Sequence, residues 1–179
     1  MIKLNIGCGW RNFGNDWVHI DGGDYEHLEH KDILSLPYKN DSVDLIYGSH
    51  VLAYFDRESA LDALLEWKRV LKPSGKLRIA VPDFKTMCEL YNDGSVELLQ
   101  ILGPLYGKMI MGEETIYHKT VYDFQDLVEI LSICGFRNVV KYDWRETEHS
   151  EFDDHSQAYI PHMDKDNGTL ISLNVEATK

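Results

Sequence analysis

A pair of glycines directly after the first apolar segment is the sequence feature that most limits the fold of this chain. Leu4-Asn5-Ile6 runs into Gly7-Cys8-Gly9. Glycine adopts backbone angles that other residues avoid, so the segment predicts a strand that ends in a tight bend. In open α/β sheets, ligands bind beyond the carboxyl ends of the strands, where the backbone of such a bend can approach them.

Two further apolar segments end in a similar way. Trp17 to Ile20 is followed by Asp21 and Gly22, and Val43 to Tyr47 is followed by Gly48. Both are predicted strands. An aspartate at the end of the second strand would lie beside the first bend and could accept both hydroxyl protons of a ribose. The two features together point to a nucleoside ligand.

Helices alternate with these strands. Arg57 to Leu71 has leucines at helical spacing after a capping aspartate, and Leu77 to Val81 follows as a strand. A second helix is predicted after Asp123, ending near Gly135, with strands over Phe136 to Tyr142 and Leu170 to Ala177. This alternation predicts an α/β fold with a mainly parallel sheet.

Composition narrows the class of protein. A chain of 179 residues is expected to form a single domain over 1–179 around one core. No apolar run approaches membrane-spanning length, and three cysteines without a CxxC pair favour a reducing, cytoplasmic setting without a zinc ribbon. The formal charge of −12 disfavours nucleic acid and anionic membranes as partners.

A longer series of segments carries a family resemblance. They are Leu4 to Gly9, Asp21, Asp32-Ile33, Leu36-Pro37-Tyr38, Asp44-Leu45-Ile46, His50-Val51-Leu52 and Arg69 to Leu77. In order and spacing they resemble class I S-adenosylmethionine-dependent methyltransferases of the small type-11-like kind. The resemblance implies a Rossmann-like three-layer sandwich with a mostly parallel, seven-stranded type of sheet and an antiparallel last strand. Compared with the family, this sequence is expected to be shortened at the N-terminus.

The resemblance also implies the cofactor site. Gly7, Cys8 and Gly9 would line the methionine part of S-adenosylmethionine, Asp21 would hold its ribose, and Asp32 with Ile33 would meet its adenine. Gly48, Ser49 and His50 would flank the sulfonium. The implied cofactor-binding set is Asn5, Gly7, Cys8, Gly9, Asp21, Gly22, Asp32, Ile33, Gly48, Ser49 and His50.

Two histidines are candidates for catalysis. His118 lies before a helix where relatives often place substrate groups, and His50 follows the third predicted strand. An imidazole is suited to accept a proton near neutral pH, although either residue could equally be structural. Methyl transfer itself needs mainly alignment of the nucleophile behind the methyl group.

The chain departs from the family pattern near its start. Only Gly7 to Asp16 separate the first two strands, so the first helix must be very short, and part of the cofactor lid must come from elsewhere. Residues 84–118, broken by glycines and Pro104, are expected to form a cap over the substrate. Glu146 to Asp154 is expected to be a solvated surface loop, and Asp164 to Gly168 a hairpin turn instead of a calcium loop, so no metal site is predicted.

The favoured function is therefore transfer of a methyl group to an unidentified small-molecule acceptor. A cofactor-binding interaction module without catalysis is one alternative. An NAD(P)-dependent oxidoreductase is another, although position 12 is asparagine where a third glycine is expected, and Asp21 comes earlier than the usual acid. The sequence leaves open a homodimer.

Overall fold

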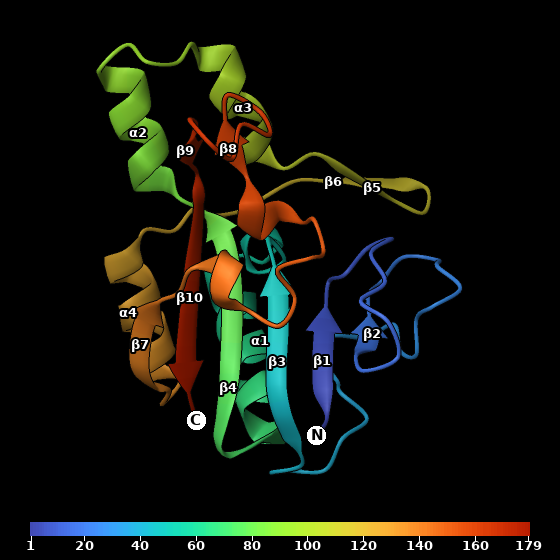
Figure 1. The fold of residues 1–179 in the computed structure, drawn as a ribbon. Helices are drawn as coiled ribbons and strands as arrows, with labels where there is room; N and C mark the ends of the chain where they lie inside the picture. The colour runs from blue at the N-terminus through green and yellow to red at the C-terminus, as the bar shows by residue number, and fades with distance from the viewer.

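The computed structural model describes residues 1–179. Its main sheet has six strands in the order β2-β1-β3-β4-β10-β7. The four strands from β2 to β4 pair in parallel, whereas β10 is antiparallel to both β4 and β7 (Figure 1). The strands are β1 (Lys3–Ile6), β2 (Val18–Ile20), β3 (Val43–Ser49), β4 (Leu71–Pro82), β7 (Arg137–Lys141) and β10 (Ser172–Thr178).

The predicted α/β class, the largely parallel sheet and the antiparallel last strand are confirmed. The sheet stops at β2, where the family resemblance implied one strand more, and only an isolated bridge between Ile20 and His30 continues it. The remaining elements are η1 (Leu52–Tyr54), α1 (Arg57–Val70), α2 (Phe84–Asn92), α3 (Leu98–Tyr106), β5 (Met109–Met111), β6 (Glu114–Ile116), α4 (Phe124–Ile133), η2 (Trp144–Glu146), η3 (His155–Gln157), β8 (Tyr159–Ile160) and β9 (Thr169–Leu170).

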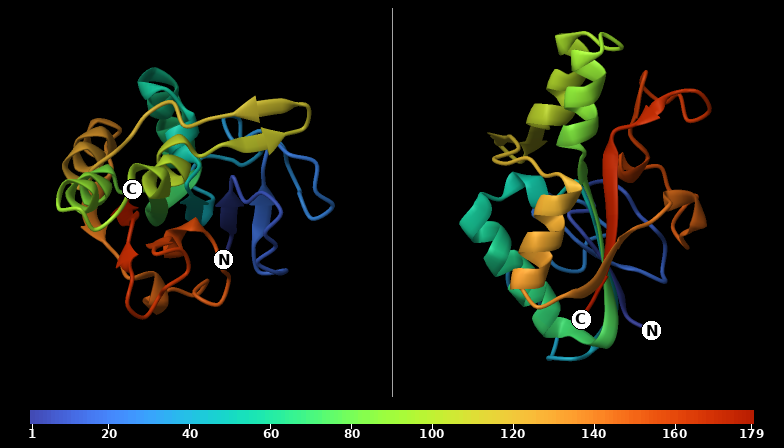
Figure 2. Two further views of the ribbon diagram at one scale, coloured as in Figure 1. Left: turned by 90° about the horizontal axis from the view of Figure 1, so that it is seen from above. Right: turned by 90° about the vertical axis from the view of Figure 1, so that its left-hand side faces the viewer.

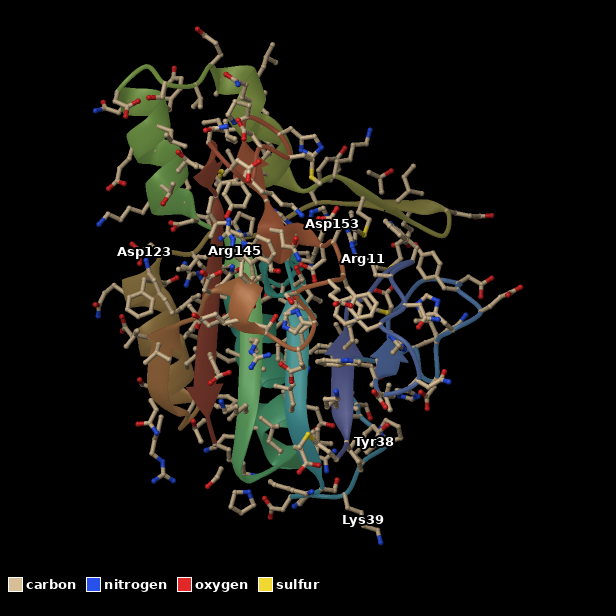
Figure 3. All side chains as sticks on the ribbon, in the orientation of Figure 1. Arg11, Tyr38, Lys39, Asp123, Arg145 and Asp153 are labelled. Carbon is tan, nitrogen blue, oxygen red and sulfur yellow. The ribbon has the colours of Figure 1, made fainter.

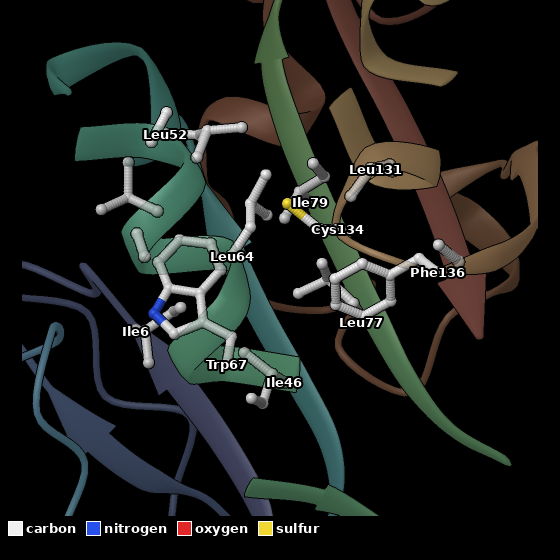
Figure 4. Packing of buried hydrophobic residues seen from close by; sticks show 14 of the residues in the cluster. Ile6, Ile46, Leu52, Leu64, Trp67, Leu77, Ile79, Leu131, Cys134 and Phe136 are labelled. Atoms are coloured by element: carbon white, nitrogen blue, oxygen red, sulfur yellow. The ribbon is translucent and has the colours of Figure 1, made fainter. Parts of the chain in front are cut away.

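One face of the sheet, here called the helical face, is apolar and lies under α1 and α4 (Figure 2, right). The strands supply alternate residues such as Ile6, Ile46 and Ile79, and α1 contributes the fully buried Trp67 (Figure 4). The N-cap of α1 forms as expected, because the Asp56 carboxylate accepts the Ser59 N–H at 2.8 Å. Apolar residues that recur every two positions in the strands and about every 3.6 positions in the helix thus pack against each other.

The opposite face, here called the polar face, carries the other alternate residues, among them Asn5, Tyr47, Arg78 and Asn174. No α-helix covers it. The irregular segment 142–160, coloured orange in Figure 2, lies across it instead. The expected short helix after β1 is also absent, since the chain between β1 and β2 contains only turns. The chain from β1 to β2 instead places Phe13 and Trp17 on this face, beside Tyr47.

The expectation of a solvated loop over Glu146 to Asp154 is wrong for part of the segment, although its glutamates are exposed. His149 is fully buried and Asp154 is 6% exposed. The ring of Phe152 stacks on Phe13 at 4.5 Å between centroids, which anchors the segment to the sheet. The charges misled the prediction, because one of them, Glu148, pairs with the buried Arg78 at 2.7 Å.

Residues 84–118 stand beyond the carboxyl ends of the parallel strands as α2, α3 and the hairpin β5–β6 (Figure 1). The hairpin reaches back over the loops that follow β1 and β2 (Figure 2, left). The turn predicted over Asp164 to Gly168 is confirmed, with the Gly168 N–H donating to the Asp164 carbonyl at 2.9 Å. None of the helices combines the length and apolar character needed to cross a bilayer.

Candidate active site

The bend after β1 has the strained backbone that its glycines allow. Gly7 and Gly9 have φ of +64° and +57°. A side chain at Gly7 would overlap Val51, whereas at Gly9 it would meet nothing within 4 Å. Gly7 is therefore needed for close packing, and Gly9 leaves the backbone open on its outer side. The amides of Cys8 and Trp10 have no acceptor within the protein.

Asp21 closes the space beside this bend. Its Oδ2 accepts the Gly9 N–H at 2.8 Å and its Oδ1 accepts the Gly23 N–H at 2.7 Å. A carboxylate offers about four acceptor positions, so roughly two remain for a ligand. The side chain is 7% exposed, and its charge contributes, after burial, to raising the pKa of the Cys8 thiol to about 12. Cys8 is therefore a neutral neighbour and not a nucleophile.

The segment expected to meet adenine lies alongside. The Asp21 N–H donates to the His30 carbonyl at 3.3 Å, and a side chain at Gly22 would come within 4.0 Å of the Lys31 carbonyl oxygen. The structure thus brings Gly22 next to the loop of Asp32 and Ile33. The Asp32 carboxylate is exposed and accepts the Leu34 N–H at 2.8 Å.

Asn5 lies away from the bend. It sits within β1 on the polar face, opposite His19 and Tyr47, and its Nδ2 is buried without a partner. Gly48 and Ser49, at the end of β3, also face protein. A side chain at Gly48 would come within 2.9 Å of Val51, and the Ser49 hydroxyl donates to Asp154 at 3.3 Å.

His50 follows β3 with a φ of +55°, a left-handed conformation that is uncommon for histidine. Its N–H donates to the Ala80 carbonyl at 2.8 Å, which holds this backbone against β4. Its Nε2 lies 3.0 Å from the Ser172 hydroxyl oxygen. Burial, followed by the neighbouring His155, His118 and Arg11, holds the pKa of His50 well below its usual value, so the ring is neutral at pH 7.

A cavity of about 730 Å³ begins beside His50 and lies under the cap. Its walls come from Arg11 just beyond the bend, the chain after β3, α3 with the start of β5, and the segment 153–163. The residues that matter below are Arg11, His50, Tyr54, Lys108, His118 and His155. The cavity is therefore bounded by His50 and part of residues 84–118. Asp83, which caps α2, does not line it, although the sequence also suggested Asp83 as a boundary of the substrate pocket.

His118 joins the cavity wall at the base of the cap. Its Nδ1 lies 3.2 Å from the Leu105 carbonyl, its Nε2 is buried without a partner, and its ring lies so close to Gly107 that a side chain there would overlap it. Burial lowers the pKa of His118. The rings of His50 and His118 have centroids 6.5 Å apart, so the structure does bring the two predicted histidines together.

Comparison with known proteins agrees with this geometry. Residues 4–79, which hold the glycine bend, Asp21 and His50, match the family described as "Methyltransferase domain". Over this part of its length the chain is similar to methyltransferases. A demethylmenaquinone methyltransferase of Staphylococcus haemolyticus is 27% identical over 125 residues, or 63% of this chain and 48% of that protein. The chain thus spans about half the length of this curated relative.

Solved methyltransferases share the fold. A S-adenosylmethionine-dependent methyltransferase from Archaeoglobus fulgidus superposes with a TM-score of 0.61 at 16% identity, covering 99% of this chain and 86% of that one. A 1,6-didemethyltoxoflavin-N1-methyltransferase from Burkholderia thailandensis, solved with S-adenosylhomocysteine, gives a TM-score of 0.56 at 13% identity, covering 99% and 70%. At these identities the likeness concerns the fold alone.

This similarity implies S-adenosylmethionine as the cofactor, and the residues present fit it. The open side of Gly9, the two unpartnered amides and the spare acceptor positions of Asp21 offer the groups that an amino acid and a ribose need. The hairpin β5–β6 covers the site from above, because a side chain at Gly22 would come within 3.1 Å of the Met111 sulfur. In this chain the covering segment comes from the cap.

Sequence reasoning missed one wall of the cavity. Arg11 and the segment 153–163 were given no role in the site, yet the Arg11 Nε donates to the Asp153 carbonyl at 2.9 Å (Figure 3). Charged residues in the acidic stretch hid this contact. The aromatic residues Trp144 and Phe152, in and beside that stretch, were the available signal, since a solvated loop seldom carries such side chains.

Proposed function

We propose that this chain transfers a methyl group from S-adenosylmethionine to a small-molecule acceptor held in the cavity under the cap. The observation that carries the proposal is that Asp21 is fixed against the glycine bend while Arg11, two residues beyond Gly9, already lines the cavity. The cofactor site and the acceptor space are therefore adjacent. When bound, S-adenosylmethionine supplies an electrophilic methyl group on its sulfonium.

The proposed cofactor contacts follow from that placement. The bend would hold the amino-acid part of the cofactor, Asp21 the ribose hydroxyls, and the loop of Asp32 and Ile33 the base. Three residues of the implied set, Asn5, Gly48 and Ser49, have side-chain positions that face protein. They would support the site indirectly, by packing and by stabilising the polar face of the sheet. The residues we assign to direct contact are Gly7, Cys8, Gly9, Asp21, Gly22, Asp32, Ile33 and His50.

A chain of hydrogen bonds fixes which nitrogen of His50 carries the proton. The Asn174 Nδ2 donates to the Ser156 carbonyl at 2.9 Å, which turns its Oδ1 toward Ser172. The Ser172 hydroxyl donates to that Oδ1 at 3.0 Å and must then accept from His50 Nε2–H. In the neutral ring, Nδ1 is left with a lone pair. This atom has no protein partner and is not sealed from solvent.

We therefore propose His50 as the group that accepts a proton from an acceptor hydroxyl or amine. Its ring is neutral at pH 7 and lines the cavity, so the lone pair is available. His118 is placed differently, since its one unpartnered nitrogen is buried. We propose that His118 shapes the cavity wall and braces the cap, with catalytic contact only if the cap moves.

The names of the relatives do not identify the methyl acceptor of this chain. One is named for demethylmenaquinone and another for 1,6-didemethyltoxoflavin. Residues 84–118 form much of the cavity's upper wall, so we propose that this cap selects the acceptor.

Calorimetry with S-adenosylmethionine, S-adenosylhomocysteine and NADH tests the proposal. We expect S-adenosylhomocysteine to bind and to stabilise the fold by about 2.7 kcal/mol at a hundred-fold excess over its Kd. Preferential binding of NADH would instead support an oxidoreductase. Release of S-adenosylhomocysteine across a panel of hydroxyl, amine and carbon acceptors measures turnover, and His50→Gln should reduce it more than His118→Gln. Cofactor binding without turnover of any acceptor would leave the interaction module as the better assignment.

A further inference from the structure

The cavity is unusual for a chain with a formal charge of −12, because its two carboxylates are both engaged elsewhere. Asp153 forms an ion pair with Lys165 at 2.9 Å. Asp154 accepts from the Tyr47 hydroxyl at 2.6 Å and from the Ser156 N–H at 2.7 Å, on the polar face of the sheet. Neither charge is left to neutralise a cation in the cavity.

Two cations in the same walls have no carboxylate partner. Neither Arg11 nor Lys108 forms an ion pair within the protein, although both line the cavity. The Arg11 guanidinium is nonetheless held in place, by its Nε bond to the Asp153 carbonyl and by the Trp10 ring, 4.9 Å from its centre. Its two terminal nitrogens have no protein acceptor. A fixed guanidinium with two free NH2 groups suits a planar or tetrahedral oxyanion.

Imidazole rings line the same cavity. The ring centroids of His50 and His155 are 5.3 Å apart, and His118 lies on the other side of His50. Burial lowers the pKa of all three, and the positive charge of Arg11 lowers those of His50 and His155 further. A negative group entering here would be attracted by Arg11, and the neutral rings carry no charge that competes for it.

We propose that the methyl acceptor carries an oxyanion, a carboxylate or a phosphate, which Arg11 binds from below and Lys108 from the cap. This inference rests on the proposed methyl transfer, since it concerns the second substrate of that reaction. It gives Arg11 a specificity role, because an acceptor with a neutral or cationic group in this position would leave the guanidinium unpartnered.

Binding of small aromatic probes to the full chain, with saturating S-adenosylhomocysteine, tests this charge preference. Benzoate and phenyl phosphate provide the two oxyanions, and benzamide and benzylamine are their neutral and cationic counterparts. We expect at least one of the oxyanions to bind ten-fold or more tightly than benzamide, and benzylamine to bind most weakly. Comparison of benzoate with phenyl phosphate separates the two sources of charge. Equal affinity for all four probes would overturn the proposal.

A matched pair of variants assigns the preference to Arg11. Arg11→Gln should remove the ten-fold advantage of the oxyanion, whereas Arg137→Gln, at an exposed arginine at the start of β7, should leave it unchanged. Arg11 could instead hold the cofactor's own carboxylate. In that case Arg11→Gln would weaken S-adenosylhomocysteine but not 5′-methylthioadenosine, which lacks the amino-acid group, and the probe preference would persist, contradicting the inference.

The same measurements separate failure of this inference from failure of the proposed function. If S-adenosylhomocysteine does not bind the unmodified chain, the methyl-transfer assignment fails. The four probes would then be titrated without it, and an oxyanion preference that depends on Arg11 would still show an anion site in the cavity. If S-adenosylhomocysteine binds but the probes show no charge preference, only the acceptor class is wrong.

Discussion

The two faces of the central sheet are built in different ways. The helical face is a continuous apolar surface under α1 and α4, and its largest fully buried side chain is Trp67. The polar face buries Asn5, Tyr47, Arg78 and Asn174 beneath a segment without an α-helix. Burial of apolar area stabilises the first, whereas the second combines paired polar groups such as Arg78 and Tyr47 with unpartnered ones such as His149.

This difference separates stability from function. The helical face shapes the sheet, and no residue of α1 or α4 lines the cavity. The polar face continues through Ser172 to His50, and its cover supplies the cavity wall from Asp153 to Met163. A substitution on the helical face should therefore affect folding first, and one on the polar face should also affect the site.

The largest expected effect is on the helical face. Trp67→Ala removes a fully buried ring and the hydrogen bond from its Nε1 to the Ile33 carbonyl at 2.8 Å. We expect the free energy of unfolding in urea to fall by about 3–5 kcal/mol. Leu65→Ala, at an exposed position of the same helix, should change it by no more than about 0.5 kcal/mol. Equal losses in the two variants would contradict the assignment of this face as the main source of stability.

On the polar face, His149 makes stability depend on pH. The ring is fully buried, neither nitrogen has a partner, and burial lowers its pKa to about 4. In the unfolded chain the ring takes up a proton near pH 6.5, while in the folded chain it stays neutral down to about pH 4. Its contribution to stability is therefore complete above pH 6.5 and is lost as the pH falls, by roughly 3 kcal/mol in all.

The variant His149→Phe tests this without changing the shape of the ring greatly. We expect a flatter dependence of unfolding free energy on pH between 6.5 and 4, and a protein at least as stable at pH 7, because no unpartnered nitrogens remain. His162→Phe, at an exposed histidine, serves as control and should retain the original slope. An unchanged slope in His149→Phe would show that the ring is not held neutral.

The sequence predicted the helical face well, for a physical reason. Apolar residues at period 2 and 3.6, a capping Asp56 and the glycines at the ends of strands are local signals, and each required only its neighbours in the chain. The glycine bend and Asp21 were predicted in the same way. Their contact, the Gly9 N–H bonded to the Asp21 carboxylate, then emerged from the pairing of β1 with β2.

The polar face could not be predicted from local signals. Glu148, His149 and Asp154 belong to a charged run that resembles a solvated loop, although His149 and Asp154 are buried. Long-range partners of its charged residues help to hold the run against the sheet. Glu148 needs Arg78, 70 residues earlier, and Asp154 needs Tyr47, 107 residues earlier. The cavity wall from Asp153 to Met163 was missed for the same reason, because it overlaps the end of this charged run and continues from it along the chain.

At the site itself, Asp21→Ala should weaken binding of S-adenosylhomocysteine by at least ten-fold, since a charge-assisted contact contributes about 1.5–3 kcal/mol. The variant also removes the acceptor of two backbone amides, so unfolding should be measured beside calorimetry. Asp24→Ala is the control, because that carboxylate lies nearby in the same loop and is almost fully exposed. Unchanged affinity in Asp21→Ala would remove Asp21 from the cofactor site.

The smallest expected effect is at Ser172, where the polar face meets the cavity. Ser172→Ala removes the hydroxyl that links His50 Nε2–H to Asn174 Oδ1. Both groups then lack this partner, and the free energy of unfolding should fall by about 1 kcal/mol. The informative measurement is the ¹⁵N NMR spectrum of the His50 ring. In the unmodified chain the proton should be on Nε2, and in Ser172→Ala the two tautomers should become mixed, with a corresponding loss of turnover. A proton on Nδ1 of the unmodified protein would show that the polar face does not orient this ring, and the link between the sheet's second face and the chemistry would fail.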